Sequence, residues 1–127
     1  MNIPAELKYT KSHEWLKAEA DGSYAIGLTD YAQKQLGDIV FINLPAEGDT
    51  VTAGEAMADV ESVKAVSDVF SPVTGTIAAV NEDLMDEPQQ MNQAPYDAWI
   101  AKIGDVTATE ELLSAKEYET FCSSAKE

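Results

Sequence analysis

The sequence predicts a mainly β fold in which antiparallel strands are framed by two helices. Several apolar or alternating runs are each of strand length. Gly, Pro, Asn and Asp residues separate these runs so closely that hairpins are favoured over parallel crossovers. The expected strands are Tyr24–Gly27, Ile39–Leu44, Ala56–Val63, Ala65–Phe70, Thr76–Val80 and Trp99–Ile103. At 127 residues, of which 45% are apolar, the chain is expected to form a single domain, residues 1–127.

A short helix is expected near residues 29–36. Thr29 can cap it, Asp30 suits its positive N-terminal end, and Gly37 can stop it in the left-handed αL conformation. A further helical turn is expected in residues 81–90, where Pro88 would end it.

A longer helix is expected at the C-terminus, over about residues 108–125. Thr107 and Glu110 have the spacing of a capping box, T-x-x-E. The apolar residues that follow lie on one side at helical spacing, as expected for a helix packed on the sheet. Cys122 belongs to this stripe and is expected in the core rather than in a nucleophilic pair with His13.

The composition excludes several classes of function. Twenty-three acidic residues against eight lysines and no arginine give a formal charge of -15, so phosphate backbones and anionic lipids are expected to repel the chain. One cysteine permits no intramolecular disulfide and no thiolate metal cluster, and a reducing compartment is expected. The N-terminal segment lacks the apolar region of a signal peptide, which favours a cytoplasmic location. No metal site, nucleic-acid partner or membrane partner is expected.

The most informative segment is the predicted hairpin around Lys64. A two-residue loop at Val63-Lys64 would pair the flanking residues and send alternate side chains to opposite faces. Ala58, Val60 and Val69 then face inward. The expected pairs are Ser62 with Ala65, Glu61 with Val66, Val60 with Ser67, Asp59 with Asp68, Ala58 with Val69, and Met57 with Phe70.

This register has two unfavourable features. Asp59 and Asp68 face each other directly, and like charges in that relation destabilise a sheet. The loop also lacks the Asn-Gly or Gly-x pair that two-residue hairpins prefer, so a type I turn or a longer loop is an alternative. In each version Lys64 lies at or beside the tip, with carboxylates nearby.

A lysine at a hairpin tip can simply be solvated. A lysine that attacks carbonyls unaided must lose its proton, whereas nearby carboxylates favour the charged ammonium. Schiff-base catalysis by Lys64 is therefore disfavoured. An exposed lysine beside an acidic face suits covalent modification, which makes the chain a candidate carrier.

The residues around Lys64 resemble the lipoylation segment of the H protein of the glycine cleavage system. Matching motifs continue on both sides, from about Tyr9 to about Tyr118, in the same order. One departure is Ala98, where the family usually has Gly before the Trp, so a positive φ or close packing there would require adjustment. The matching residues are Glu61-Ser62-Val63-Lys64-Ala65, Ser67-Asp68, Ser71-Pro72-x-x-Gly75, Tyr9-Thr10-Lys11-Ser12-His13-Glu14-Trp15, Gly27-Leu28-Thr29-Asp30-Tyr31-Ala32-Gln33, Leu36-Gly37-Asp38, Leu44-Pro45, Asn81, Pro88, Asn92, Pro95-Tyr96 and Trp99.

The resemblance implies a sandwich of two antiparallel sheets, flattened and barrel-like, as in lipoyl and biotinyl carriers. It implies that Lys64 carries lipoate in amide linkage and that Glu61, Val63, Ala65 and Asp68 form the surroundings read by the lipoyl-transferring enzyme. The implied task is to carry the aminomethyl group of glycine from glycine decarboxylase, which uses pyridoxal phosphate, to the tetrahydrofolate-dependent aminomethyltransferase. Dihydrolipoyl dehydrogenase, with flavin and NAD, then receives the reducing equivalents. Such a shuttle, expected as a monomer, needs no catalysis of its own.

The resemblance also suggests where a loaded arm could rest. Ser12 and Glu14 are candidates to accept a hydrogen bond from the cargo amine; the alternative is that Glu14 is an ordinary surface carboxylate. Three other functions stay open at this point: a lipoyl or biotinyl domain of another multienzyme complex, a lipoate-relay carrier that passes lipoyl groups to other proteins, and a small enzyme with Lys64 as its nucleophile.

Overall fold

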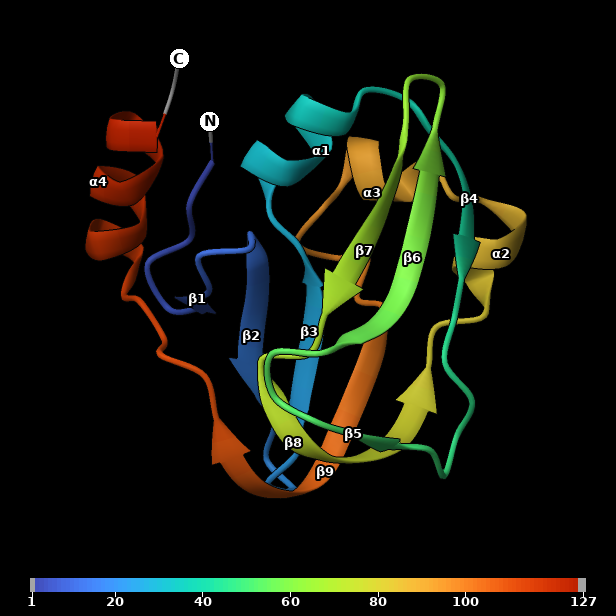
Figure 1. Cartoon of the computed structure of the whole chain (residues 1–127), viewed down its shortest axis with the longest axis vertical. Coiled ribbons are helices and arrows are strands. Elements are labelled where there is room, and N and C mark those ends of the chain that lie inside the picture. The colour runs from blue at the N-terminus through green and yellow to red at the C-terminus, as the bar shows by residue number, and fades with distance from the viewer. Residues whose placement is uncertain (1, 126–127) are drawn as a thin grey trace.

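Two antiparallel β-sheets pack face to face in the computed structural model, which describes residues 2–125 (Figure 1). The larger sheet has the strand order β1-β2-β3-β9-β8-β5, and the smaller has the order β4-β6-β7. The strands are β1 Lys8–Tyr9, β2 Glu14–Ala18, β3 Tyr24–Leu28, β4 Ile39–Asn43, β5 Thr50–Val51, β6 Ala56–Ser62, β7 Val66–Phe70, β8 Val73–Val80 and β9 Ala101–Thr109. The helices are α1 Asp30–Leu36, α2 Asp83–Asp86, α3 Gln90–Gln93 and α4 Ala115–Ala125. The predicted mainly β sandwich of two antiparallel sheets is confirmed.

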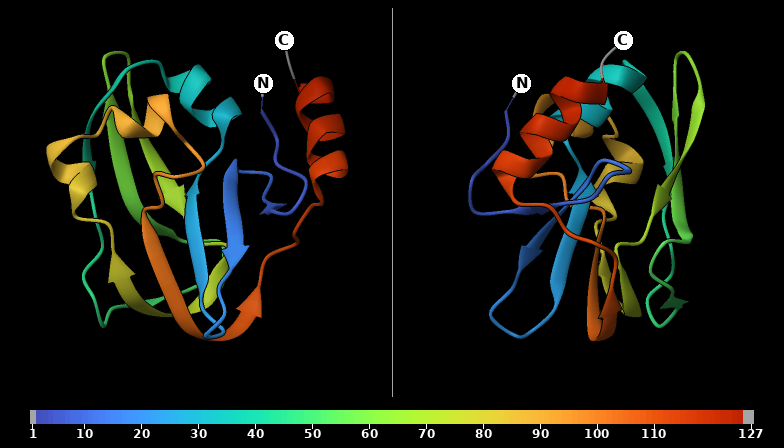
Figure 2. Two further views of the ribbon diagram at one scale, coloured as in Figure 1. Left: turned by 180° about the vertical axis from the view of Figure 1, so that it is seen from behind. Right: turned by 60° about the vertical axis from the view of Figure 1, so that its left-hand side comes forward.

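The main core fills the space between the two sheets, which the right-hand view of Figure 2 shows as separate layers. Alternation along the strands supplies it, because every second side chain of a strand points to the same face. Val60 of β6, Val69 of β7 and Ile26 of β3 are each fully buried there. The small sheet is therefore packed on the large sheet along most of its length. Only the end of the small sheet that carries the turn between β6 and β7 extends beyond it.

Helix α1 begins and ends close to the predicted positions. The Thr29 hydroxyl accepts a hydrogen bond from the Ala32 amide at 3.1 Å, as an N-cap does. Gly37 ends the helix with φ +80°, but its ψ of -157° lies outside the αL region. The predicted αL stop is thus wrong in ψ, although the need for glycine at this position is real. The turn expected in residues 81–90 is α2.

The start of the C-terminal helix differs from the prediction of about residue 108. Thr107 lies in β9, which continues to Thr109 because it pairs with β8 as far as Val73. The helix begins at Ala115, where Ser114 and Glu117 exchange hydrogen bonds between side chains and backbone amides. The capping box is therefore Ser114–Glu117 rather than Thr107–Glu110.

Several strand predictions also need correction. Strand β8 begins at Val73, three residues before the expected strand Thr76–Val80. Strand β9 begins at Ala101, so the expected strand Trp99–Ile103 began too early and ended too soon. Strands β1, β2 and β5 were not predicted, since two of them span only two residues and β2 shows no clear alternation. Ala98 is buried without a positive φ, so alanine is accommodated at this position.

Helix α4 packs on the outer side of the large sheet through a second apolar cluster. The rings of Tyr9 and Tyr118 stack with centroids 4.7 Å apart, and Cys122 is 2% exposed. The expected core position of Cys122 is confirmed, and burial raises the pKa of its thiol. Among the described residues, none of the helices is long and apolar enough to cross a membrane.

Candidate functional site

The β6–β7 hairpin adopts the predicted register over most of its length. Four predicted pairs are observed, and the predicted Met57–Phe70 pair is not, because a bulge brings Ala56 opposite Phe70. Alternation places Ala58, Val60 and Val69 in the core, as expected. The observed pairs are Glu61 with Val66, Val60 with Ser67, Asp59 with Asp68, and Ala58 with Val69.

The tip is a two-residue turn at Val63-Lys64, closed by a hydrogen bond from the Ser62 amide to the Ala65 carbonyl at 2.8 Å. Neither Val63 nor Lys64 has a positive φ, which excludes the type I′ and II′ turns. The Ser62 hydroxyl accepts from the amides of Lys64 and Ala65, each at 3.1 Å. The Ser62 side chain therefore stabilises the turn by accepting from its amides, without the positive φ angles that an Asn-Gly pair provides in other hairpins.

A second contact supports the tip from outside the hairpin. The Val63 amide donates to the Asp38 carbonyl at 3.0 Å, in the segment between α1 and β4. The Lys64 stem lies over Gly37, where an added Cβ would be 3.5 Å from Lys64 Cε. The turn between β6 and β7 lies at one end of the molecule, beside the connection from α1 to β4 (Figure 1), and Lys64 in this turn is exposed. The tip thus presents its lysine to solvent on a supported backbone.

Carboxylates and apolar side chains alternate on the outer face of the small sheet. Asp59 and Asp68 lie opposite each other as predicted, and the Asn43 amide donates to the Asp59 carboxylate at 2.8 Å, which reduces their repulsion. Glu61 lies between Phe41 and Val66. Of the five exposed large hydrophobic side chains among the described residues, four surround the tip: Val40, Phe41, Val63 and Val66.

Glu14 is not a surface carboxylate, because its side chain is 1% exposed at the start of β2. Its Oε1 accepts from the hydroxyls of Thr10 and Ser12, and its Oε2 accepts from the Phe70 amide at 3.1 Å. Desolvation raises the pKa of Glu14, and these three hydrogen bonds act in the opposite direction. Glu14 thus holds a buried acidic group directly against β7 of the lysine hairpin, behind the exposed Ser12.

Ser12 lies at the junction of two cavities. One, of about 130 Å³, runs between the hairpin and α1, with apolar lining from Leu28, Ala32, Leu36 and Val60 and polar lining from Ser12, His13, Gln35, Ser67 and Asp68. The other, of about 400 Å³, is lined by Thr10, Lys11, Ser12, Gly54, Phe70, Ser71, Pro72, Glu110 and Glu111. The three groups that hydrogen-bond Glu14 all line the larger cavity. A chain anchored at Lys64 could therefore follow an apolar path toward a polar end.

The two remaining candidates, His13 and Cys122, are not brought together as a catalytic pair. His13 Nδ1 lies 2.7 Å from the Tyr118 hydroxyl, and its ring stacks on Tyr31. Burial lowers the pKa of His13. Within residues 2–125, no group of three or more His, Cys, Asp or Glu side chains could hold a metal ion.

Sequence reasoning missed two groups that support the site. Thr10 donates to Glu14, four residues along the chain, and Asn92 accepts from Ile39 at the start of β4. Asn92 matched a family motif, but nothing adjacent to it in the sequence indicates its partners, which lie 53 to 59 residues away. Only the fold reveals these contacts.

Comparisons with known proteins agree on one family. The family model described as "Glycine cleavage H-protein" matches residues 7–125. A glycine cleavage system H protein of Lachnoclostridium phytofermentans is 55% identical, with 95% of each chain covered. One from Escherichia coli is 54% identical over 94% of this chain and 95% of its own. The crystal structure of a glycine cleavage system H protein from Mycobacterium marinum superposes with a TM-score of 0.89 at 41% identity, covering 95% of this chain and 99% of that one.

Proposed function

This chain belongs to the glycine cleavage H-protein family, and from that premise we propose that Lys64 is the residue to which lipoate is attached in amide linkage. The chain is a lipoyl carrier of the glycine cleavage system. The observation that supports Lys64 as the attachment site is its exposed position in a two-residue turn. The backbone of this turn is held by the hydrogen bond from Val63 to Asp38. A modifying enzyme can reach an amine in that position without unfolding any part of the protein.

The surroundings of Lys64 fit a lipoyl group. Val63 and Ala65 flank it and are exposed, while Glu61 and Asp68 supply negative charge on the outer face. When bound, lipoate supplies a disulfide that can accept the aminomethyl group and electrons. Attachment removes the charge of Lys64, which leaves the carboxylates as the local field. We therefore propose that the lipoyl-transferring enzyme reads these four neighbours.

The same surface suits repeated, transient docking. Val40, Phe41, Val63 and Val66 offer apolar contacts among carboxylates, so a partner with apolar and basic groups around its own active site would be attracted. We propose that glycine decarboxylase, the aminomethyltransferase and dihydrolipoyl dehydrogenase each approach this end of a monomer in the cytoplasm. The chain itself supplies no catalysis in this proposal, because it only delivers the group to enzymes that hold the cofactors.

The cavity between the hairpin and α1 provides a resting place for the arm. A lysine with a lipoyl group reaches about 14 Å by ordinary bond geometry. Leu28, Leu36 and Val60 give the cavity apolar walls, and Ser12 lies at its polar end. There the Ser12 hydroxyl can accept from the cargo amine while it donates to Glu14, whose buried carboxylate favours a positive charge nearby. The polar end can thus hold the amine while the walls exclude water.

Mass analysis of intact protein and of peptides tests the attachment site. After incubation with lipoate, ATP to activate its carboxylate, and a lipoate ligase, the peptide containing Lys64 should gain one lipoyl increment. The Lys64→Ala variant should gain none. The control is Lys17→Ala, which removes a different exposed lysine, on β2, and should gain the increment as wild type does. A lipoyl increment on a different lysine, or none on wild type, would overturn the proposal.

A second measurement tests the resting place. We expect Glu14→Gln to speed the loss of the aminomethyl cargo to water, because the neutral amide attracts the cargo amine less than a carboxylate does. Thr120→Ala, on the exposed side of α4, serves as the control. An unchanged rate in Glu14→Gln would remove Glu14 from the proposal and leave the assignment of Lys64 intact.

A further inference from the structure

The side chain of Asn92, in α3, holds the segment that supports the hairpin tip. Its Nδ2 donates to the Gly37 carbonyl at 2.8 Å, and its Oδ1 accepts from the Ile39 amide at 2.9 Å. Nδ2 also donates to Gln33 Oε1 at 2.9 Å. Both N–H groups and the oxygen of this side-chain amide therefore form hydrogen bonds. Two of the three bonds hold Gly37 and Ile39, the residues on either side of Asp38.

The gripped segment is the one that contacts the tip. Asp38 lies between the two residues bound by Asn92, and its carbonyl accepts from the Val63 amide. The Lys64 stem crosses Gly37 within van der Waals distance. Asn92 is thus linked to the backbone of the tip through residues 37–39, although its hydrogen bonds go to Gln33, Gly37 and Ile39 and not to Val63 or Lys64.

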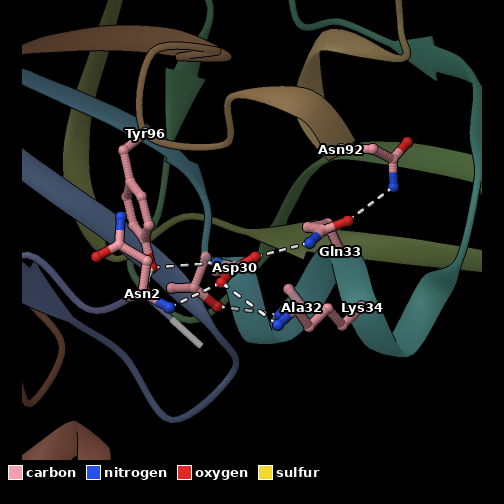
Figure 3. A network of polar contacts seen from close by, with 8 residues as sticks. Asn2, Asp30, Ala32, Gln33, Lys34, Asn92 and Tyr96 are labelled. Atoms are coloured by element: carbon pink, nitrogen blue, oxygen red, sulfur yellow. Dashed lines mark hydrogen bonds and ion pairs between the residues drawn. The ribbon is translucent and has the colours of Figure 1, made fainter.

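The orientation of the Asn92 amide is set by a chain of polar contacts through α1 (Figure 3). Gln33 Nε2 donates to Asp30 Oδ1 at 2.7 Å, and the Asn2 amide donates to Asp30 Oδ2 at 2.8 Å. Because the carboxylate can only accept, Gln33 must turn its nitrogen toward Asp30 and its oxygen toward Asn92. Asn92 must then turn its nitrogen toward Gln33, which leaves its oxygen for Ile39.

We propose that Asn92 is a positioning residue for the lipoyl-lysine. It fixes residues 37–39 as a rigid support, so that the tip meets each enzyme in one geometry rather than in many. The inference rests on the proposed attachment at Lys64. The physical basis of this role is pre-organisation. A tip held only by its own strands would have to become ordered when an enzyme docks, so the enzyme would bind it more weakly than it binds the supported tip.

Asn92→Asp tests the proposal because it keeps the shape and reverses one hydrogen bond. One oxygen of the new carboxylate can still accept from Ile39. The other faces two acceptors, the Gly37 carbonyl and Gln33 Oε1, and repels both. Gln33 cannot relieve this by flipping, because its oxygen would then face Asp30. When the carboxyl is protonated it can donate to Gly37 again, so the support returns at low pH.

The control is Gln93→Glu, which places the same charge on the neighbouring exposed position of α3. In amide NMR spectra, the resonances of Val63 and Lys64 should shift with pH in Asn92→Asp and move toward wild-type positions as the pH falls. They should show no matching shift in Gln93→Glu, so native carboxylates such as Asp30 and Asp38 cannot explain the difference. Equal pH profiles in the two variants would overturn the proposal.

Transfer of lipoate supplies the functional readout. At neutral pH, kcat/KM of a lipoate ligase for the apo chain should fall about tenfold in Asn92→Asp, through KM, and stay within about twofold in Gln93→Glu. If Asn92→Asp does not fold at neutral pH, Asn92→Ala takes its place. Hydrogen exchange at Val63 should then become roughly tenfold faster while the Ser71 amide, bound to Glu55 at the other end of β7, keeps its protection. Unchanged exchange at Val63 refutes the inference.

The outcomes separate this inference from the proposed function. If the wild-type chain takes no lipoate at Lys64, the proposed function fails and the positioning role fails with it. If the wild type is lipoylated normally and Asn92→Asp matches it in kcat/KM, only the positioning role of Asn92 fails.

Discussion

Gly37→Ala should destabilise the fold and disturb the support of Lys64 at the same time. Gly37 has φ +80° and ψ -157°, a backbone region that is almost exclusive to glycine. Holding alanine there costs about 1–3 kcal/mol. The added Cβ would lie 3.5 Å from Lys64 Cε, an ordinary contact, so strain rather than collision sets the magnitude. The chain can relieve it only by moving the carbonyls of Gly37 and Asp38.

The assay has two parts, thermal unfolding and amide hydrogen exchange. For a chain of this length, about 1–3 kcal/mol corresponds to a fall in Tm of roughly 3–12 °C. If the backbone relaxes, the bond from the Val63 amide to Asp38 is lost, and exchange at Val63 should accelerate. Lipoate transfer to Lys64 should slow under the same conditions.

Gly48→Ala is the matched control. Gly48 has φ +92°, and an added Cβ there meets nothing within 4 Å. This variant should lower Tm through strain alone and leave exchange at Val63 unchanged. The reasoning is refuted if Gly37→Ala melts within about 1 °C of wild type and keeps its protection at Val63, because alanine would then fit the observed backbone without strain or movement.

Three other substitutions have outcomes that follow from the structure. Gly27→Ala places a Cβ 2.6 Å from the ring of Trp15, which is buried and donates a hydrogen bond to the Pro95 carbonyl. Urea unfolding should therefore show that the free energy of unfolding falls by about 1–3 kcal/mol, and a smaller loss would mean that the ring can move. Glu14→Gln should gain stability relative to wild type as the pH rises above about 4.5, because a raised carboxyl pKa makes the charged folded form less stable; a pH-independent difference contradicts this. Ser62→Ala should cost about 0.5–1 kcal/mol in the same urea assay, since the amides of Lys64 and Ala65 lose their acceptor, and no change would show that water replaces the hydroxyl fully.

The hairpin register could be predicted because it depends on local rules. A two-residue loop and a period of two fix which side chains of β6 and β7 face the core, so Val60 and Val69 were placed correctly. The bulge that brings Ala56 opposite Phe70 could not be predicted. The nearest glycine in the sequence, Gly54, precedes β6 and does not indicate a change of register within the strand.

The C-terminal helix shows why local signals can mislead. Two capping boxes occur within eleven residues, one beginning at Thr107 and one at Ser114, and each satisfies the pattern. Pairing between β8 and β9 extends to Thr109 and decides between them, because residues that complete a sheet are not free to start a helix. Pairing of this kind joins residues far apart in the sequence, so a single sequence does not reveal it.

Glu14 illustrates what sequence can say about a site and where physics adds to it. From the motif Ser12-His13-Glu14-Trp15 alone, Glu14 could equally be a solvated surface carboxylate or a buried group. The fold buries it because Trp15 and Leu16 on either side of the sheet enter separate apolar clusters and bring β2 inward. Its burial is tolerated only since Thr10, Ser12 and the Phe70 amide supply hydrogen bonds, and Phe70 belongs to the strand that carries the lysine hairpin. A buried acid that is tied to the hairpin and lies next to an exposed hydroxyl is the kind of group that the proposed binding of a positively charged cargo amine would require.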